Sequence, residues 1–325
     1  MKGIQLSTFK PTSLVAILAI TLAAMAACGD EPKSGSSNKQ TLDRLVVATT
    51  FYPTTYFAER ILGDLGEVKC PVPADADPIF WKPRDEDIAT FVAADLIILN
   101  GAEFEKWVAS ASLPESRVVN SAQELESEFL NFESGATTHS HGPQGEHSHE
   151  GLDGHTWLDP LNAKRQAQAI TKAMVRLLPQ NKATLEANAR ALNQDLDTLD
   201  KNLRNLVAEI DKLPAIFASH PAYNYLAKRY KLPIINLDLD PESIPSDSAI
   251  QSIAQKAKSQ SIRAIIWESQ PTPEVAAAFK KRCGLTSFVV SPAETLDANS
   301  RASGTHYLSI MNQNLRALGE AFATQ

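Results

Sequence analysis

The chain has 325 residues, with 31 lysine and arginine side chains against 38 aspartate and glutamate side chains, and a formal net charge of −7. This acidic balance argues against a nucleic acid partner, which would require a basic face, and is compatible with the handling of cations. The length is sufficient for two lobes with separate hydrophobic cores.

The first 28 residues predict an export signal. Lys2 and Lys10 precede the apolar run Leu14–Ala27, which is shorter than the ~20 residues that span a bilayer, so a transmembrane anchor is the weaker alternative. Cys28 follows small residues, as at the cleavage site of a bacterial lipoprotein. We expect lipid attached to Cys28 and a flexible tether over residues 29–43, which are polar and rich in glycine and serine.

Strand and helix patterns alternate after the tether. They predict strands at residues 45–50, 68–72 and 95–101 and helices at residues 54–64, 85–94 and 104–110. Strands that alternate with helices of this length indicate a parallel α/β sheet. We therefore predict an N-terminal α/β lobe over residues 44–180.

A histidine-rich loop interrupts this lobe at residues 136–154. Five of the seven histidines lie in it or directly after it: His139, His141, His147, His149 and His155. Imidazole is the commonest side-chain metal ligand, and the glycine, proline, serine and glutamate between the first four cannot build a core. We predict that those four collect metal, with a solvated tract or a tag as the alternative. His155 is predicted as a fixed ligand, because an ordered segment begins at Trp157.

The middle of the chain is helical. After a helix at residues 163–178, leucine and isoleucine recur at helical spacing from Leu185 to Ile210 and form one apolar stripe of roughly 40 Å. A coiled-coil dimer would need more heptads and clearer charge pairing. We predict a spine helix over residues 181–212 that packs across both lobes, followed by a C-terminal α/β lobe over residues 213–325.

The strand and helix alternation returns in that last lobe. It predicts strands at residues 215–219, 233–239, 262–268 and 287–291 and helices at residues 221–230, 246–260, 272–283 and 305–324. Open α/β sheets bind ligands at the carboxyl ends of their strands, where His220 and Glu268 lie. Cys70 and Cys283 have no C-x-x-C spacing, and we rank buried hydrophobic residues first, a disulfide second and metal ligands third.

Five motifs in a fixed order resemble one protein family. They are ADLIILNG at residues 94–101, GHTWLDPLNA at 154–163, SHPAYNYLAKRY at 219–230, IIWESQPTPE at 265–274 and GTHYLSIMNQNLRAL at 304–318. The chain resembles the periplasmic metal-binding lipoproteins of the zinc-uptake and metal-adhesin type, which deliver zinc or manganese to ABC importers. The resemblance implies two α/β lobes with parallel sheets, joined by one long rigid helix, with a metal site in the cleft between them.

The resemblance also assigns metal ligands. The family's second and third ligand histidines fall on His155 and His220, and its C-terminal aspartate falls on Asp297. Its first ligand histidine falls on Ile79, which cannot bind a metal.

Three explanations fit an isoleucine at this position. The site has three protein ligands and a water molecule, or a carboxylate such as Asp77 or Glu268 is the fourth ligand, or metal binding has been lost. The retained ligands disfavour the third explanation.

We therefore predict a solute-binding protein that is not an enzyme. It would be a lipid-anchored monomer of the periplasm or cell surface that binds Zn²⁺, or alternatively Mn²⁺, and delivers it to an ABC permease in the inner membrane. One alternative is a zinc-dependent hydrolase, against which the chain has no H-E-x-x-H or G-x-S-x-G motif. The other is an adhesion lipoprotein with the same fold and a degenerate metal site.

Overall fold

The computed structural model describes residues 44–132, 139–140, 146–147 and 151–324. The predicted export signal, the predicted lipidation site Cys28 and the predicted tether lie outside the described residues, as do His141 and His149. Within the described part of the chain, no helix combines the length and the apolar character that a membrane span requires.

The N-terminal lobe is built on a parallel sheet with the strand order β2-β1-β3-β4. Its strands are β1 (Leu45–Thr49), β2 (Gly66–Lys69), β3 (Leu96–Leu99) and β4 (Val118–Asn120). β3 is buried along its whole length, which accounts for its unbroken apolar sequence. A Cβ atom at Gly66 would lie 2.2 Å from the carbonyl oxygen of Leu45, so β2 can start beside β1 only with glycine at this position.

Three α-helices accompany this sheet: α1 (Tyr52–Leu62), α2 (Asp85–Ala93) and α3 (Pro160–Leu177). Asp159 caps α3 by accepting a hydrogen bond from the backbone N–H of Leu161, and proline follows it at the first helical position. The segment at residues 104–110, predicted as a helix, is a short 3-10 helix over Lys106–Ser110. Further 3-10 helices lie at Gly63–Leu65, Glu115–Arg117, Gln123–Glu128, Thr156–Leu158 and Pro179–Asn181.

Two short antiparallel strand pairs accompany the histidine-rich loop, one at its two ends and one within it. The sequence patterns predict neither pair. β5 (Leu130–Asn131) pairs with β8 (Leu152–Asp153), and β6 (His139–Ser140) pairs with β7 (Glu146–His147). The backbone positions of His139 and His147 lie opposite each other in the second pair. The β5–β8 pair brings the two ends of the loop together directly before His155.

The C-terminal lobe repeats the architecture with the strand order β10-β9-β11-β12, again parallel. Its strands are β9 (Ile216–Ala218), β10 (Ile234–Asn236), β11 (Ala264–Trp267) and β12 (Thr286–Val289). Its helices are α5 (Asn224–Tyr230), α6 (Asp247–Gln260), α7 (Pro273–Cys283), α8 (Ala298–Ala302) and α9 (Tyr307–Ala323), with a 3-10 helix at Pro221–Tyr223.

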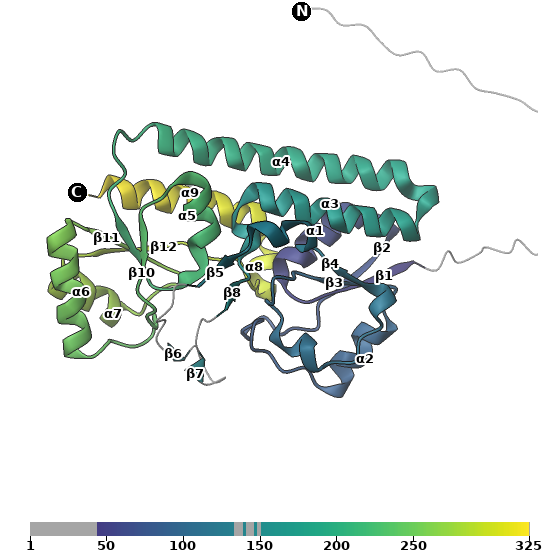
Figure 1. Cartoon of the computed structure of the whole chain (residues 1–325), viewed down its shortest axis with the longest axis horizontal. Coiled ribbons are helices and arrows are strands. Elements are labelled where there is room, and N and C mark those ends of the chain that lie inside the picture. Colours follow the sequence, from purple (N-terminus) through teal and green to yellow (C-terminus); the bar gives the residue numbers. More distant parts are fainter. Residues whose placement is uncertain (1–43, 133–138, 141–145, 148–150, 325) are drawn as a thin grey trace, which may run out of the picture. The chain divides into compact units, whose positions relative to one another are not determined.

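The helix α4 (Lys182–Ala208) joins the two lobes. Its 27 residues correspond to a rod of roughly 40 Å. It contacts α1 and α3 on one side of the molecule and α5 and α9 on the other, and Figure 1 shows it running alongside both lobes. The predicted packing of a spine helix across both lobes is confirmed, although the helix ends before residue 212.

One hydrophobic cluster extends through both lobes and α4. It includes Val47 and Ile98 of the first sheet, Leu196 of α4, and Ile216 and Ile266 of the second sheet. The two sheets are therefore connected by continuous apolar packing, which stabilises their arrangement around the cleft.

The two cysteines of the described region do not form a disulfide. Cys70 and Cys283 are both free thiols, and Cys283 is buried in a second hydrophobic cluster of the C-terminal lobe. For Cys283 this matches the interpretation that ranks first from the sequence, a buried small hydrophobic residue.

Candidate metal centre

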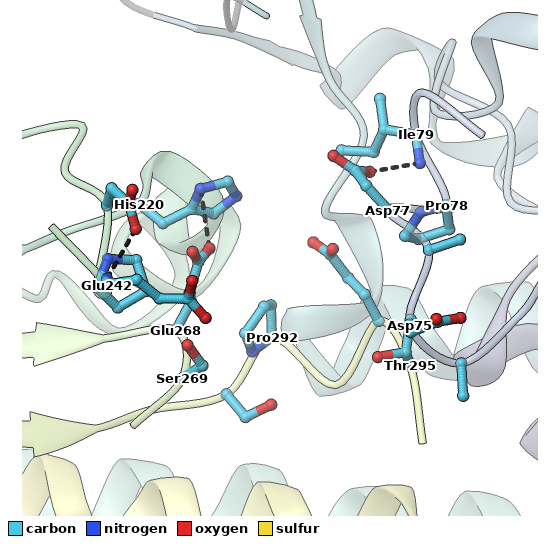
Figure 2. A pocket seen from close by; sticks show the side chains of 16 residues that line it. Asp75, Asp77, Pro78, Ile79, His220, Glu242, Glu268, Ser269, Pro292 and Thr295 are labelled. Atoms are coloured by element: carbon cyan, nitrogen blue, oxygen red, sulfur yellow. Dashed lines mark hydrogen bonds and ion pairs between the residues drawn. The ribbon is translucent and has the colours of Figure 1, made fainter. Parts of the chain in front are cut away.

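A cavity of about 370 Å³ lies between the two lobes. In Figure 2, Asp77 and Ile79 of the N-terminal lobe face His220 and Glu268 of the C-terminal lobe across it. No lysine or arginine is among the described residues that line the cavity, whereas six carboxylates are: Asp75, Asp77, Asp240, Glu242, Glu268 and Glu294. A cavity with this charge favours a cation.

The carboxylates of the cavity disfavour one another's ionised form. Burial, followed by the charge of Glu294, raises the pKa of Asp77 to about 6. Burial, Glu294 and Asp77 raise the pKa of Glu268 to about 8. A divalent cation among these groups would remove the repulsion and favour their ionised form.

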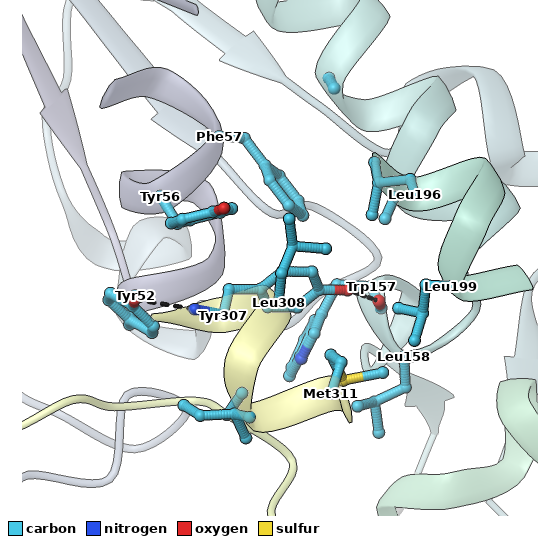
Figure 3. Packing of buried hydrophobic residues seen from close by; sticks show 14 of the residues in the cluster. Tyr52, Tyr56, Phe57, Trp157, Leu158, Leu196, Leu199, Tyr307, Leu308 and Met311 are labelled. Atoms are coloured by element: carbon cyan, nitrogen blue, oxygen red, sulfur yellow. Dashed lines mark hydrogen bonds between the residues drawn. The ribbon is translucent and has the colours of Figure 1, made fainter. Parts of the chain in front are cut away.

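The segment that follows His155 fixes its position beside Glu294 and His220, which both line the cavity. Trp157 is fully buried, and its indole N–H donates a hydrogen bond of 2.7 Å to the carbonyl oxygen of Pro292. The Tyr307 hydroxyl donates to the Trp157 carbonyl oxygen at 2.6 Å, and Figure 3 shows both rings packed between α1, α4 and α9. On the other side of His155, a Cβ atom at Gly154 would lie 2.9 Å from the Phe104 Cβ, so the backbone approaches Phe104 closely.

The imidazole of His155 lies between two carboxylates. Its Nδ1 is 2.7 Å from Asp153 Oδ1, and its Nε2 is 2.9 Å from Glu294 Oε1. The ring is completely buried, which by itself would lower the pKa of His155, but Asp153 and Glu294 outweigh burial and raise the pKa to about 10. The metal-free site therefore holds a proton on His155 that a metal ion must displace.

His220 enters the cavity from the carboxyl end of β9, as the sequence predicts. Its side chain is 5% exposed, and its Nδ1 lies 3.0 Å from Glu268 Oε2, at the end of the neighbouring strand β11. The ring centroids of His220 and His155 are 5.6 Å apart. The two imidazoles from different lobes are thus close enough to share one ion.

Glu294 is the candidate site residue that sequence reasoning missed. It lies in the loop after β12, next to Ala293, whose φ of 59° is in the left-handed region. Its carbonyl oxygen accepts a hydrogen bond of 3.2 Å from the backbone N–H of Tyr52 in α1, which fixes the loop against the N-terminal lobe. The rule that ligands gather at the carboxyl ends of strands, applied to β12 as well, would have indicated the loop that holds both Glu294 and Asp297, without a choice between them.

Among the described residues, His155, His220 and Glu294 form a cluster suited to a metal ion. Each offers one ligand atom, and these atoms all lie within 4.8 Å of one another. Two imidazole nitrogens and one carboxylate oxygen are a donor set that zinc accepts in tetrahedral geometry with one position left for a further ligand.

Asp297, which the resemblance indicates as a ligand, is not part of this cluster. Its exposed carboxylate caps α8 and accepts hydrogen bonds from the backbone N–H groups of Asn299 at 2.9 Å and Ser300 at 3.0 Å. The hydrogen bond that the Ser300 hydroxyl donates to Asp297, followed by the one from the Ser300 backbone N–H, lowers the pKa of Asp297. The Asp297 carboxylate thus caps α8, and among the described residues Glu294, not Asp297, belongs to the three-residue cluster.

Ile79 is where the family's first ligand histidine was expected, and its side chain contributes an apolar surface to the cavity. Its backbone N–H donates to Asp77 Oδ1 at 2.8 Å, which holds the Asp77 carboxylate at the cavity wall. Asp77 and Glu268 therefore both line the space next to the three-residue cluster.

Two parallel α/β lobes, a shared long helix and a buried cluster of metal-ligating side chains between the lobes define a metal-binding solute-binding protein. Residues 47–321 match the family model described as "Zinc-uptake complex component A periplasmic" (ZnuA). The chain belongs to this family, whose members are substrate-binding proteins and not enzymes. This confirms the predicted class and removes the hydrolase alternative.

The comparisons with individual proteins agree with the family. The chain is 31% identical over 326 residues to the high-affinity zinc uptake system protein ZnuA of Bacillus subtilis, and the match covers 96% of this chain and 98% of the relative. It is 28% identical over 287 residues to the zinc-binding lipoprotein AdcA of Streptococcus pneumoniae, covering 87% of this chain and 57% of AdcA.

Two solved structures confirm the fold. The metal-dependent lipoprotein YcdH of Bacillus subtilis aligns with a TM-score of 0.75 at 29% identity, covering 86% of this chain and 99% of YcdH. The Zn(II)-bound ZnuA-like domain of Streptococcus pneumoniae AdcA also aligns with a TM-score of 0.75, at 25% identity, covering 86% of this chain and 99% of that domain.

Proposed function

We propose that this protein captures Zn²⁺ at His155, His220 and Glu294 and delivers it to an ABC-type permease. The observation that carries the proposal is the convergence of two buried imidazoles and one carboxylate, with ligand atoms within 4.8 Å of one another, beside an acidic cavity that His220 and Glu294 line between the lobes. The names of the relatives support the cargo, because one is a high-affinity zinc uptake protein and another a zinc-binding lipoprotein.

Three protein ligands leave one position of a tetrahedral zinc ion open. Asp77, Glu268 or a water molecule can take that position, since both carboxylates line the cavity. Manganese is the alternative cargo, but it prefers octahedral coordination by oxygen ligands, which two imidazoles do not supply.

The test is metal content after purification. The full chain, loaded with a mixture of zinc and excess manganese and freed of weakly bound metal by gel filtration, should retain one zinc per chain. Elemental analysis measures both metals. A chain that retains neither metal would contradict the proposal and favour the adhesion lipoprotein, and one that retains manganese instead of zinc would refute the cargo.

We also propose that His139, His141, His147 and His149 form an auxiliary, weaker metal-collecting loop, a proposal that rests on the sequence. A variant with all four replaced by asparagine should keep the single tightly held zinc in the same measurement. It should lose the additional zinc ions that the parent binds before gel filtration. Equal zinc content of parent and variant before filtration would rule out the collecting role.

Finally, we propose that the protein is a monomer and that lipid on Cys28 anchors it to the membrane. Residues 29–43 would form the tether to the folded part, in which the spine helix joins the two lobes. Mass spectrometry of the membrane-extracted protein should show a mature chain that begins at a lipid-modified Cys28. Cys28→Ser should release the protein from the membrane fraction, and light scattering of this released form should give the monomer mass. An uncleaved N-terminus in the extracted protein would contradict the lipid anchor at Cys28, and a dimer mass would contradict the monomer.

A further inference from the structure

We propose that Asp153 is a positioning residue for the metal ligand His155, and that Asn224 of the opposite lobe holds Asp153 in place. The inference rests on the proposed function, because it concerns how a metal ligand is oriented. It adds a residue that neither the sequence patterns nor the family resemblance indicates.

Both oxygens of the Asp153 carboxylate have defined partners. Oδ1 accepts a hydrogen bond from the backbone N–H of His155 at 2.9 Å and faces its ring Nδ1 at 2.7 Å. Oδ2 accepts a hydrogen bond of 2.9 Å from the Asn224 side-chain amide. Asp153 is completely buried and lies outside the three-residue cluster, and both of its carboxylate oxygens are engaged by His155 and Asn224, so its role is to act on His155 and not to bind metal itself.

These contacts determine which nitrogen of His155 can bind metal. A carboxylate at Nδ1 keeps the proton on that nitrogen and leaves the Nε2 lone pair for the metal. Nε2 is the atom that faces Glu294, 2.9 Å away, within the metal-ligating cluster. The Asp153 charge also makes the imidazole a stronger donor.

The C-terminal lobe supports Asp153 through two residues at the start of α5. The Asn224 side-chain oxygen accepts a hydrogen bond of 3.0 Å from the Asn236 amide at the end of β10, which orients the Asn224 amide N–H toward Asp153. The Tyr225 hydroxyl donates to the Asp153 carbonyl oxygen at 2.9 Å. The orientation of His155 therefore depends on contacts from the lobe that carries His220.

Asp153→Asn tests the proposal with little change of volume. The new side chain has one oxygen and one NH₂ group, whereas His155 Nδ1 and the Asn224 amide both donate a hydrogen bond to Asp153 in the parent. The NH₂ group must face one of these two donors, so one of the two hydrogen bonds is lost. We expect zinc affinity, measured by competition with a chelator, to fall by ~10–100-fold. The absorption spectrum of bound Co²⁺ should change, because the ligand geometry changes.

The double variant Asp153→Asn/Asn224→Asp provides the rescue. The new amide at position 153 would then accept from His155 through its oxygen and donate through its N–H group to the new carboxylate at position 224. This exchange restores the hydrogen bonds that join position 153 to His155 and to position 224, and the one from Asn236, with the charge moved to α5. Only the hydrogen bond of 3.2 Å that Asn224 donates to the Pro221 carbonyl oxygen is lost, because a carboxylate has no N–H group. We expect zinc affinity to return to within ~10-fold of the parent and the Co²⁺ spectrum to match it. A double variant as weak as Asp153→Asn would overturn positioning by hydrogen bonds.

Asp159→Asn is the matched control. Asp159 is also buried and also binds α5, through Arg229 Nε at 2.7 Å, but it contacts none of the three ligands. This variant should keep the zinc affinity and Co²⁺ spectrum of the parent while its metal-free form melts at a lower temperature. Zinc affinity that falls as much in Asp159→Asn as in Asp153→Asn would reduce the effect to general destabilisation and overturn the inference.

Zinc binding by the parent chain distinguishes a failure of the proposed function from a failure of the inference on Asp153. A parent that binds no zinc would overturn both the proposed function and this inference. A parent that binds zinc, with an Asp153→Asn variant of equal affinity and identical Co²⁺ spectrum, would overturn the inference alone.

Discussion

Glu294→Gln should remove tight zinc binding, whereas Asp297→Asn should leave it unchanged. Glutamine keeps the size of Glu294 but loses the negative charge of a ligand that lies 2.9 Å from His155. We expect the zinc affinity of Glu294→Gln to fall by more than the ~10–100-fold that is typical when an outer-shell partner is lost. Chelator competition with the purified variants measures both effects.

Asp297→Asn is the matched control, because it also replaces a carboxylate by the amide of the same size. Asp297 lies three residues after Glu294 in the same loop. Asparagine caps a helix about as well as aspartate, so α8 should remain intact. The opposite result, with loss of zinc in Asp297→Asn and retention in Glu294→Gln, would restore the ligand that the family resemblance indicates and refute the assignment from the structure.

The metal-free protein should become less stable as the pH rises from 6.5 to 8. Burial lowers the pKa of His155, but Asp153 and Glu294 raise it from 6.5 to about 10. Burial, Glu294 and Asp77 raise the pKa of Glu268 from 4.5 to about 8. Across this window the folded state keeps most of the protons on both groups, whereas unfolded Glu268 is already ionised and unfolded His155 loses its proton as the pH rises past 6.5. The free energy of unfolding should therefore fall by ~1–2 kcal/mol per pH unit.

Zinc should oppose this loss of stability. The bound ion requires His155 without its Nε2 proton and ionised carboxylates, so binding releases protons and becomes stronger as the pH rises. Since a ligand stabilises the folded state according to its affinity, the difference in melting temperature between zinc-loaded and metal-free protein should widen from pH 6.5 to 8. Differential scanning calorimetry at several pH values measures it, and a constant or narrowing difference would contradict the electrostatic description of the site.

The two sheets and the spine helix could be predicted because their signals are local. The apolar stripe of α4 and the apolar run of β3 determine their structures without knowledge of distant residues. β4 has only three half-buried residues, too few for a pattern. The pairing of β5 with β8 joins Leu130 to Asp153 across the histidine-rich loop, and such a long-range contact leaves no periodicity in the sequence.

The site could be predicted only in part for a related reason. His155 and His220 belong to sequence motifs and lie at element ends, which makes them recognisable. Glu294 and Asp297 carry the same chemistry in one loop, and the choice between them depends on the left-handed backbone of Ala293 and on the hydrogen bond from Tyr52. These are properties of the folded backbone, and the spacing of residues in the sequence does not predict them.

The most direct test of the central claim is a crystal structure of the zinc-loaded protein with anomalous diffraction recorded at the zinc edge. The account predicts one strong anomalous peak in the cavity between the lobes, at bonding distance from His155 Nε2, from the His220 ring and from the Glu294 carboxylate. Zinc–nitrogen and zinc–oxygen distances should be ~2.0–2.2 Å. A peak bound by neither His155 nor His220, or one bound by Asp297 in place of Glu294, would contradict it.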